Sequence, residues 1–329
     1  MVNSNNVTIK YVPESAYGIT PSNSTDWNYL RYSSETINAD LSFVESSAVE
    51  RDRMLREYVQ TAVSVSGGFS SDFSLGIYDK FIESVFCSTW NGDNLDIGYN
   101  YTSFTFEKHY IDLDKYSYFT GMRVNEMNLN IVPNDKITST FNFLGKESDV
   151  STQSLVGVLG SVTDYPYAPI TVSNRVGALL VDNNPVELQV TELTLNINNN
   201  LRQRNCIGSK SPVDTLLGEA TVTGTISMFL TANAWEMYKK VATQEDMSFY
   251  YEIDDGDNKL LILLPRIRLN SPTPTITGKD NDVYVQFEFR ALRDNSLNTA
   301  VRISKRYGYS DGVDGWYNYY FLPYSGSAY

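Results

Sequence analysis

The second half of this chain repeats the pattern of its first half. A strand-like stretch at Val65–Phe69 precedes a short helical stretch at Tyr78–Phe81, and Val222–Ile226 precedes a similar stretch at Trp235–Tyr238. A structural unit that recurs in one chain buries its apolar surface against its neighbours. Because two units are too few for a solenoid, the repeat predicts an assembly in which the units close into a ring.

Further matches keep the same order in both halves. Asp79 and Glu236 fall in the first turn of each expected helix, where an acidic side chain favours the positive helix end. Gly76 and Asn233 are the expected N-caps of these helices. The remaining matched stretches are Arg123–Val124 with Arg266–Ile267, and Lys136–Phe143 with Asp282–Phe289.

Composition excludes several classes of function. The chain has 329 residues, of which 42% are hydrophobic, so it is long enough for two domains with ordinary cores. Its single histidine, His109, excludes a histidine-based triad or a multi-histidine metal site within one chain. The net charge of −13 argues against nucleic-acid binding by phosphate neutralisation. We expect no signal peptide and no membrane span, because neither pattern is present.

Hydrophobic periodicity predicts an all-β fold. Ile37, Ala39, Leu41 and Phe43 alternate with polar residues, which is typical of antiparallel strands with one face on a core. We predict two tandem β-barrel or β-sandwich tube domains, each with one short docked α-helix. The predicted divisions are an irregular N-terminal arm at 1–26, a first domain at 27–146, a connector at 147–185, a second domain at 186–293 and an aromatic-rich C-terminal strap at 294–329.

The polar residues of these strands have two interpretations. They are mostly serine, threonine and asparagine, as on an ordinary solvated sheet face. A channel wall that carries DNA would have the same character, because cationic side chains would trap a polyanion. On the second interpretation, the polar positions that alternate with the core residues face the channel. The residues predicted to line it are Asn38, Asp40, Ser64, Ser66, Asn196, Asn198, Thr221, Thr223 and Thr225.

Two connections between paired strands are unusually long, at Val44–Tyr58 and Leu201–Gly218. Such connections are usually two to five residues, so loops of this length favour a contact role over a simple turn. The first loop carries charges of both signs around apolar residues. We expect it to contact the next ring through Val49, Arg51, Arg53, Met54, Leu55 and Arg56.

Apparent chemical motifs are weak, and we expect no enzymatic activity, no metal and no cofactor. Asp254–Asn258 lacks the spaced ligands of a calcium loop and is more simply a hairpin turn. Gly67–Gly68 is too short for a phosphate loop and favours a bulge. Trp27 and Trp90 could present sugar-binding platforms, although packing is the simpler interpretation.

Several stretches, in their order, resemble the tail tube proteins (major tail proteins) of long-tailed bacteriophages. Leu195–Arg202, followed by Ile207–Ser209, is the strongest match. The other similar stretches are Tyr11–Pro21, Tyr29–Thr36 and Phe119–Asn125. The resemblance covers about Tyr11 to Asp294 and does not extend past Lys305.

The resemblance implies a structural virion protein whose rings stack into a tail tube. With a duplicated tube domain, three chains would form a ring, and a hexamer of chains is the alternative. The implied partners are further copies of the chain, a tape measure protein and DNA that pass through the lumen without specific binding, and tail tip and tail terminator proteins at the ends. Assembly would take place in the host cytoplasm. From another class, a carbohydrate-binding β-sandwich module of a phage or cell surface remains the alternative.

Overall fold

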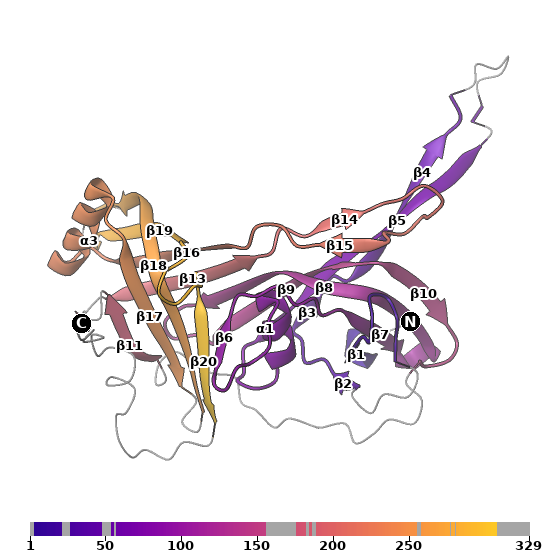
Figure 1. Cartoon of the computed structure of the whole chain (residues 1–329), viewed down its shortest axis with the longest axis horizontal. Helices are drawn as coiled ribbons and strands as arrows, with labels where there is room; N and C mark the ends of the chain where they lie inside the picture. The colour runs from indigo at the N-terminus through magenta and orange to yellow at the C-terminus, as the bar shows by residue number, and fades with distance from the viewer. Residues whose placement is uncertain are drawn as a thin grey trace, which may run out of the picture.

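The computed structural model describes residues 3–21, 27–47, 54–55, 57–155, 176–181, 184–185, 189–254, 258–276, 278–279 and 281–307. Within these residues one 18-stranded sheet runs through both halves of the chain, and β14 and β15 form a separate ladder. The molecule is elongated, with the first half at one end and the second half at the other (Figure 1). The all-β fold class predicted from the sequence is confirmed.

The elements of the first half are η1 (Ser4–Asn6), β1 (Val7–Pro13), β2 (Asn28–Tyr29), β3 (Ser34–Glu35), β4 (Asn38–Glu45), β5 (Tyr58–Asp72), α1 (Asp79–Phe86), β6 (Asn94–Asp96), β7 (Phe104–Tyr110), η2 (Ile111–Leu113), β8 (Lys115–Ile131), β9 (Thr138–Gly145) and β10 (Glu147–Ser151). Those of the second half are β11 (Val176–Val181), β12 (Asn184–Pro185), β13 (Val190–Asn198), β14 (Arg202–Arg204), β15 (Asp214–Leu216), β16 (Thr221–Phe229), α3 (Ala232–Thr243), β17 (Met247–Asp254), β18 (Asn258–Thr275), β19 (Tyr284–Ala291) and β20 (Arg302–Tyr307).

The two halves share one order of strand pairing. In the first half the ladders run β4–β5–β9–β8–β7–β1. In the second half they run β13–β16–β19–β18–β17–β11, and every pair is again antiparallel. The internal repeat read from the sequence is therefore a repeat of topology, and each of these six strands in one half has an equivalent in the other.

Pairing registers define these equivalent positions. Arg123 pairs with Leu144, and Arg268 pairs with Arg290. The sequence match of Arg123–Val124 to Arg266–Ile267 is therefore two residues out of register. A shift of two keeps every side chain on its own face, so hydrophobic alternation alone does not detect it.

Each half places one helix on the apolar face of its strands. The ring centroid of Phe81 in α1 lies 5.3 Å from that of Phe69 and 5.7 Å from that of Phe141. In the second half Ala234 and Met237 of α3 are buried. The predicted N-caps are wrong, because Tyr78 precedes α1 and Thr231 caps α3 by accepting from the Ala234 backbone N–H.

Two further expectations fail where the chain leaves or joins the sheet. Val7–Pro13, expected to be irregular, is strand β1 and pairs with β7 along its whole length. Leu41 and Phe43, expected in the core, are exposed, because the β4–β5 hairpin extends beyond the body of the molecule (Figure 1). The limits of the arm, the domains, the connector and the strap stay predictions, and 308–329 lies outside the described residues.

A strand from the second half completes the seam between the halves. β13 pairs with the end of β8, placing Asn196 opposite Asn128 and Leu193 opposite Ile131. Leu129 and Ile131 of β8 then line a small apolar hollow together with Phe249 and Tyr251 of β17. The first half therefore contributes side chains to the core of the second half, and most of the buried apolar residues of both halves form one cluster.

Because this core is shared, Ile131→Ala should destabilise the whole unassembled chain. We expect a loss of about 2–5 kcal/mol in the free energy of unfolding, within a single cooperative transition. Chemical denaturation measured by fluorescence checks this. Ile276→Ala is the matched control, because Ile276 occupies the equivalent position at the end of β18 but is exposed. Independent unfolding of the two halves would contradict the shared core.

Candidate functional site

One face of the sheet is polar across the seam. A row of directly paired residues crosses seven strands, and it consists of Ser70, Thr140, Asn128, Asn196, Thr223, Arg290 and Arg268. A parallel row consists of Asp72, Thr138, Asn130, Thr194, Thr225, Glu288 and Asn270. Paired residues of antiparallel strands share a face, so these rows form one continuous surface opposite the core.

Short polar side chains on this face bond to one another. The hydroxyls of Thr194 and Thr225 lie 2.8 Å apart across β13 and β16. Asn142 donates to Glu126 at 3.0 Å across β9 and β8. Bonds of this kind hold the side chains against the sheet, which gives a polar and ordered surface.

The nine residues predicted to line a channel all lie on this face. Asn38 pairs with Ser66 and Asp40 with Ser64, while Asn196 pairs with Thr223. Sequence reasoning missed the contribution of β8 and β9, which lies between the two predicted groups. The signal was present in the alternation of polar and apolar residues at Glu126–Ile131.

The polar face also carries cations that the sequence analysis did not place there. Arg290 lies 3.8 Å from the carboxylate of Glu219. Arg268 and Arg266 both bind Asp246, at 2.7 Å and 2.6 Å. The hydrogen bond from Arg266, together with that from Arg268, lowers the pKa of Asp246, so this carboxylate stays charged at neutral pH and offsets the arginines.

β4 and β5 remain paired out to Glu45 and Tyr58, on either side of the loop at Val44–Tyr58. Met54 and Leu55 are exposed there, whereas Val49, Arg51, Arg53 and Arg56 lie outside the described residues. Phe43 and Tyr58 stack at 4.5 Å and stiffen its base. Further exposed apolar residues of the hairpin are Leu41, Val44 and Val59.

The second long loop, Leu201–Gly218, folds against the first half. It contains the β14–β15 ladder, and its tip accepts a hydrogen bond at the Lys210 carbonyl from the Val63 backbone N–H, 2.9 Å away. The Gln203 side chain donates to the Gly145 carbonyl at 3.0 Å. The loop therefore joins the end of the seam to β5 and β9.

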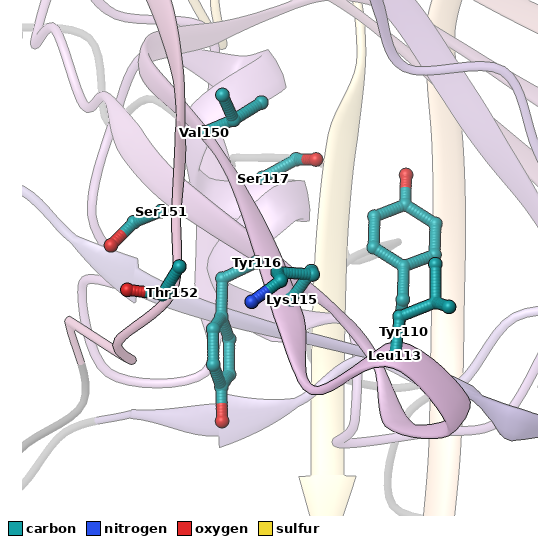
Figure 2. Close-up of a pocket in the computed structure, with 8 residues that line it drawn as sticks. All are labelled: Tyr110, Leu113, Lys115, Tyr116, Ser117, Val150, Ser151 and Thr152. Atoms are coloured by element: carbon teal, nitrogen blue, oxygen red, sulfur yellow. The ribbon is translucent and has the colours of Figure 1, made fainter.

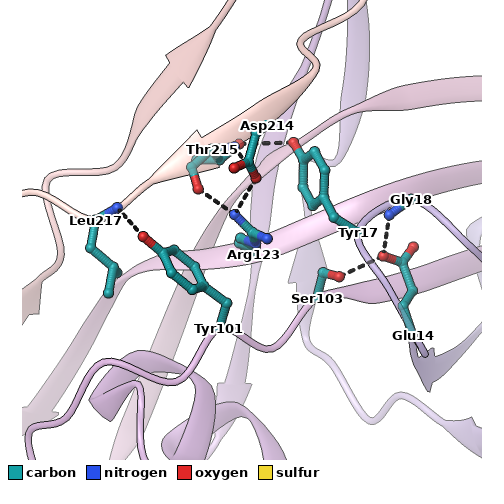
Figure 3. A network of polar contacts seen from close by, with 9 residues as sticks. All are labelled: Glu14, Tyr17, Gly18, Tyr101, Ser103, Arg123, Asp214, Thr215 and Leu217. Carbon is teal, nitrogen blue, oxygen red and sulfur yellow. Dashed lines mark hydrogen bonds and ion pairs between the residues drawn. The ribbon is translucent and has the colours of Figure 1, made fainter.

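Arg123 fixes this loop in place (Figure 3). Its guanidinium lies between the rings of Tyr17 and Tyr101, with its central carbon 4.2 Å and 4.4 Å from their centroids. It pairs with Asp214 of β15 at 3.0 Å and donates to the Thr215 carbonyl. Such a desolvated cation between two aromatic faces is held by charge, hydrogen bonds and ring electrons together.

The same cluster organises the N-terminal segment. Glu14 accepts hydrogen bonds from the Gly18 and Gly121 backbone N–H groups, each at 2.7 Å, and from the Ser103 hydroxyl at 2.6 Å. The Tyr17 hydroxyl lies 2.8 Å from that of Thr215. Residues from four separate segments thus meet around the middle of β8, at Gly121 and Arg123.

Among the strand edges that are open in the part of the chain that the structure describes, two correspond to the strands of the seam. β4 pairs with β5 alone. β18 pairs with β19 over Ile267–Thr275, and no other described strand pairs with Arg268–Thr275. Their equivalents are the two strands of the seam, because β13 corresponds to β4 and the end of β8 corresponds to the end of β18.

The structure gives no support to a sugar platform at Trp27 or Trp90, to a metal site or to a membrane-spanning helix within the described residues. Trp27 is buried, and Trp90 lies under Lys305, whose ammonium is 4.0 Å from the ring centroid. No cluster of potential metal ligands occurs among the residues with described positions. In the same part of the chain, no helix has both the length and the apolar character that crossing a membrane requires.

Open strand edges beside a continuous polar face are features of a structural subunit that pairs with copies of itself. A family model described as phage tail tube protein matches residues 4–291. Because the match spans most of the chain, this protein belongs to the phage tail tube family and is a structural component of the virion. The chain matches no curated protein.

Weakening the Arg123 cluster should release the β14–β15 loop without unfolding the chain. For Asp214→Asn we expect faster trypsin cleavage at Arg204 and Lys210, because the loss of one charged partner raises the population of the locally open state. Asp135→Asn, at an exposed turn, is the control. Cleavage at the same rate in both variants would show that Asp214 does not hold the loop.

Proposed function

We propose that the chain polymerises into stacked rings of three, which form a phage tail tube and serve as the channel for genome ejection. The observation that carries this proposal is the seam inside one chain. There β13 of the second half extends the sheet of the first half along β8. The same kind of contact between chains would continue the sheet around a closed wall with no edge left unpaired.

The open edges supply the two sides of that contact. β4 of one chain takes the role of β13, and the Arg268–Thr275 stretch of the next chain's β18 takes the role of the end of β8. Pro272 and Pro274 lie in this stretch of β18. Because proline offers no N–H group, these two positions donate no ladder hydrogen bond to a partner strand, and the proposed pairing uses the N–H groups of the other residues in the stretch.

Three chains supply six equivalent units to such a ring. Seams within chains and seams between chains would then alternate, giving quasi-sixfold symmetry from a threefold assembly. A ring of six whole chains is the alternative. The topological repeat favours three, because both units of a chain have the strand order that one position in the wall requires.

The polar face would line the lumen. Its hydroxyl and amide groups keep water on the wall, and its arginines are matched by Asp246 and Glu219. With a net charge of −13 per chain, the wall would repel rather than bind a passing polyanion. DNA and a tape measure protein would pass without specific binding, and tip and terminator proteins would close the ends of the tube.

A disulfide tests the seam between chains. Equivalence with the Asn196–Asn128 pair places Asn38 of one chain opposite Thr273 of the next. In a Cys206→Ser background, Asn38→Cys with Thr273→Cys should give covalent trimers on oxidation of assembled material, seen on non-reducing gels. Asp40→Cys with Thr275→Cys is four residues out of register and should give little. Equal cross-linking of both pairs would contradict the seam.

The β4–β5 hairpin is proposed to contact the next ring through its exposed apolar residues, with charged residues guiding the approach. Deleting residues 48–56 should therefore leave folded rings that do not stack, because the deletion leaves the proposed seam strand β4 (Asn38–Glu45) intact. Negative-stain microscopy and sedimentation measure this directly. Tubes of normal length from the deletion variant would refute the assignment.

A further inference from the structure

The seam inside the chain includes a plug as well as a ladder. The end of β8 carries Leu129 and Ile131 into a hollow of the second half. There they meet Tyr251 of β17 and the β18 residues Ile262 and Leu264. Ile131 is 5% exposed as a result.

The first half contains a hollow at the equivalent place, and it is open. Lys108 pairs with Ser117 as Tyr251 pairs with Ile262, and Phe106 pairs with Phe119 as Phe249 pairs with Leu264. Lys108, Ser117 and Phe119 line a hollow of about 350 Å³. The other residues that line it are Ile37, Asn38, Ala39, Tyr110, Ser148, Asp149 and Val150.

This hollow continues into a larger one of about 790 Å³, which shares Tyr110, Ser117 and Val150 with it (Figure 2). Lys108 does not make the smaller hollow a charged site. Its ammonium donates to the carboxylate of Glu35 at 2.6 Å and to the Ile37 carbonyl at 2.7 Å. The ammonium also lies 5.2 Å from the centre of the Phe119 ring. The charge is compensated, and the ring of Phe119 remains as an apolar wall.

A matching plug is exposed at the other end of the chain. Thr275 pairs with Tyr284 as Asn130 pairs with Thr138, so the next residue, Ile276, is the equivalent of Ile131. Its side chain is 75% exposed, in contrast to the 5% of Ile131. Ile131 is therefore buried in the seam within the chain, whereas Ile276, at the equivalent position on the outer edge, is exposed.

We propose that Ile276 of one chain inserts into the hollow beside Lys108, Ser117 and Phe119 of the next chain. The occupant of this surface is a second copy of the protein, because the same junction is already built within each chain. The inference rests on the proposed ring and adds to it the side chain that gives the seam between chains its apolar anchor. The strand pairing aligns the edges, and the plug adds a buried apolar side chain to the contact.

Assembly measurements test the plug. Burial of the Ile276 side chain would contribute to the free energy of association between chains. Ile276→Ala should therefore raise the protein concentration needed for half-assembly about tenfold. Ile276→Leu should assemble nearly as well as the natural chain. Ile207→Ala removes the same atoms from a fully exposed residue of the Leu201–Gly218 loop and should change the concentration less than about twofold. Equal effects of Ile276→Ala and Ile207→Ala would overturn the plug.

Cross-linking separates the plug from the ring itself. In a Cys206→Ser background, Ile276→Cys with Ser117→Cys should be joined between chains by a short bifunctional maleimide in assembled tubes and not in unassembled chain. Tubes that form without this cross-link would overturn the plug and leave the ring intact. Failure of the natural chain to form rings or tubes under any condition would overturn both.

Discussion

The β8–β13 ladder is the contact on which the rest of the structure depends. It joins the polar faces of the two halves into one surface and brings Leu129 and Ile131 into the core of the second half. The Arg123 cluster then holds the adjoining loop through Asp214 and the two tyrosine rings. The β6–β20 ladder and the Arg302–Asp96 ion pair also join the two halves, but the β8–β13 ladder is the contact that makes the polar face continuous across them.

The β8–β13 ladder is also the pattern for the contact that we propose between chains. A chain that already contains one seam has β4 and the end of β18 in place to form another of the same kind. Arg268, at the position of Arg123, is 42% exposed where Arg123 is 11% exposed. Residues that are buried at the inner seam are exposed at the outer one, as expected of a surface that is covered on assembly.

The sequence was sufficient to predict the fold class, the repeat and the parity of the polar residues, because these depend on periodicity. It was not sufficient for Val7–Pro13, where a short strand forms by pairing with β7, which is distant in the sequence, and with β2. Leu41 and Phe43 followed the correct alternation and were still placed wrongly in the core, since alternation gives the face of a strand but not where the body of the protein ends. The Arg123 cluster was also missed, because Tyr17, Tyr101 and Asp214 come together only through tertiary contacts.

Cryo-electron microscopy of assembled tubes tests the central claim most directly, because it separates chains within a ring and shows which sheet face meets the lumen. We expect three chains per ring, with β4 of each chain paired to β18 of the next. We also expect that the row from Ser70 to Arg268 faces the channel. Six whole chains per ring, or a lumen lined by the opposite face of the sheet, would contradict this arrangement.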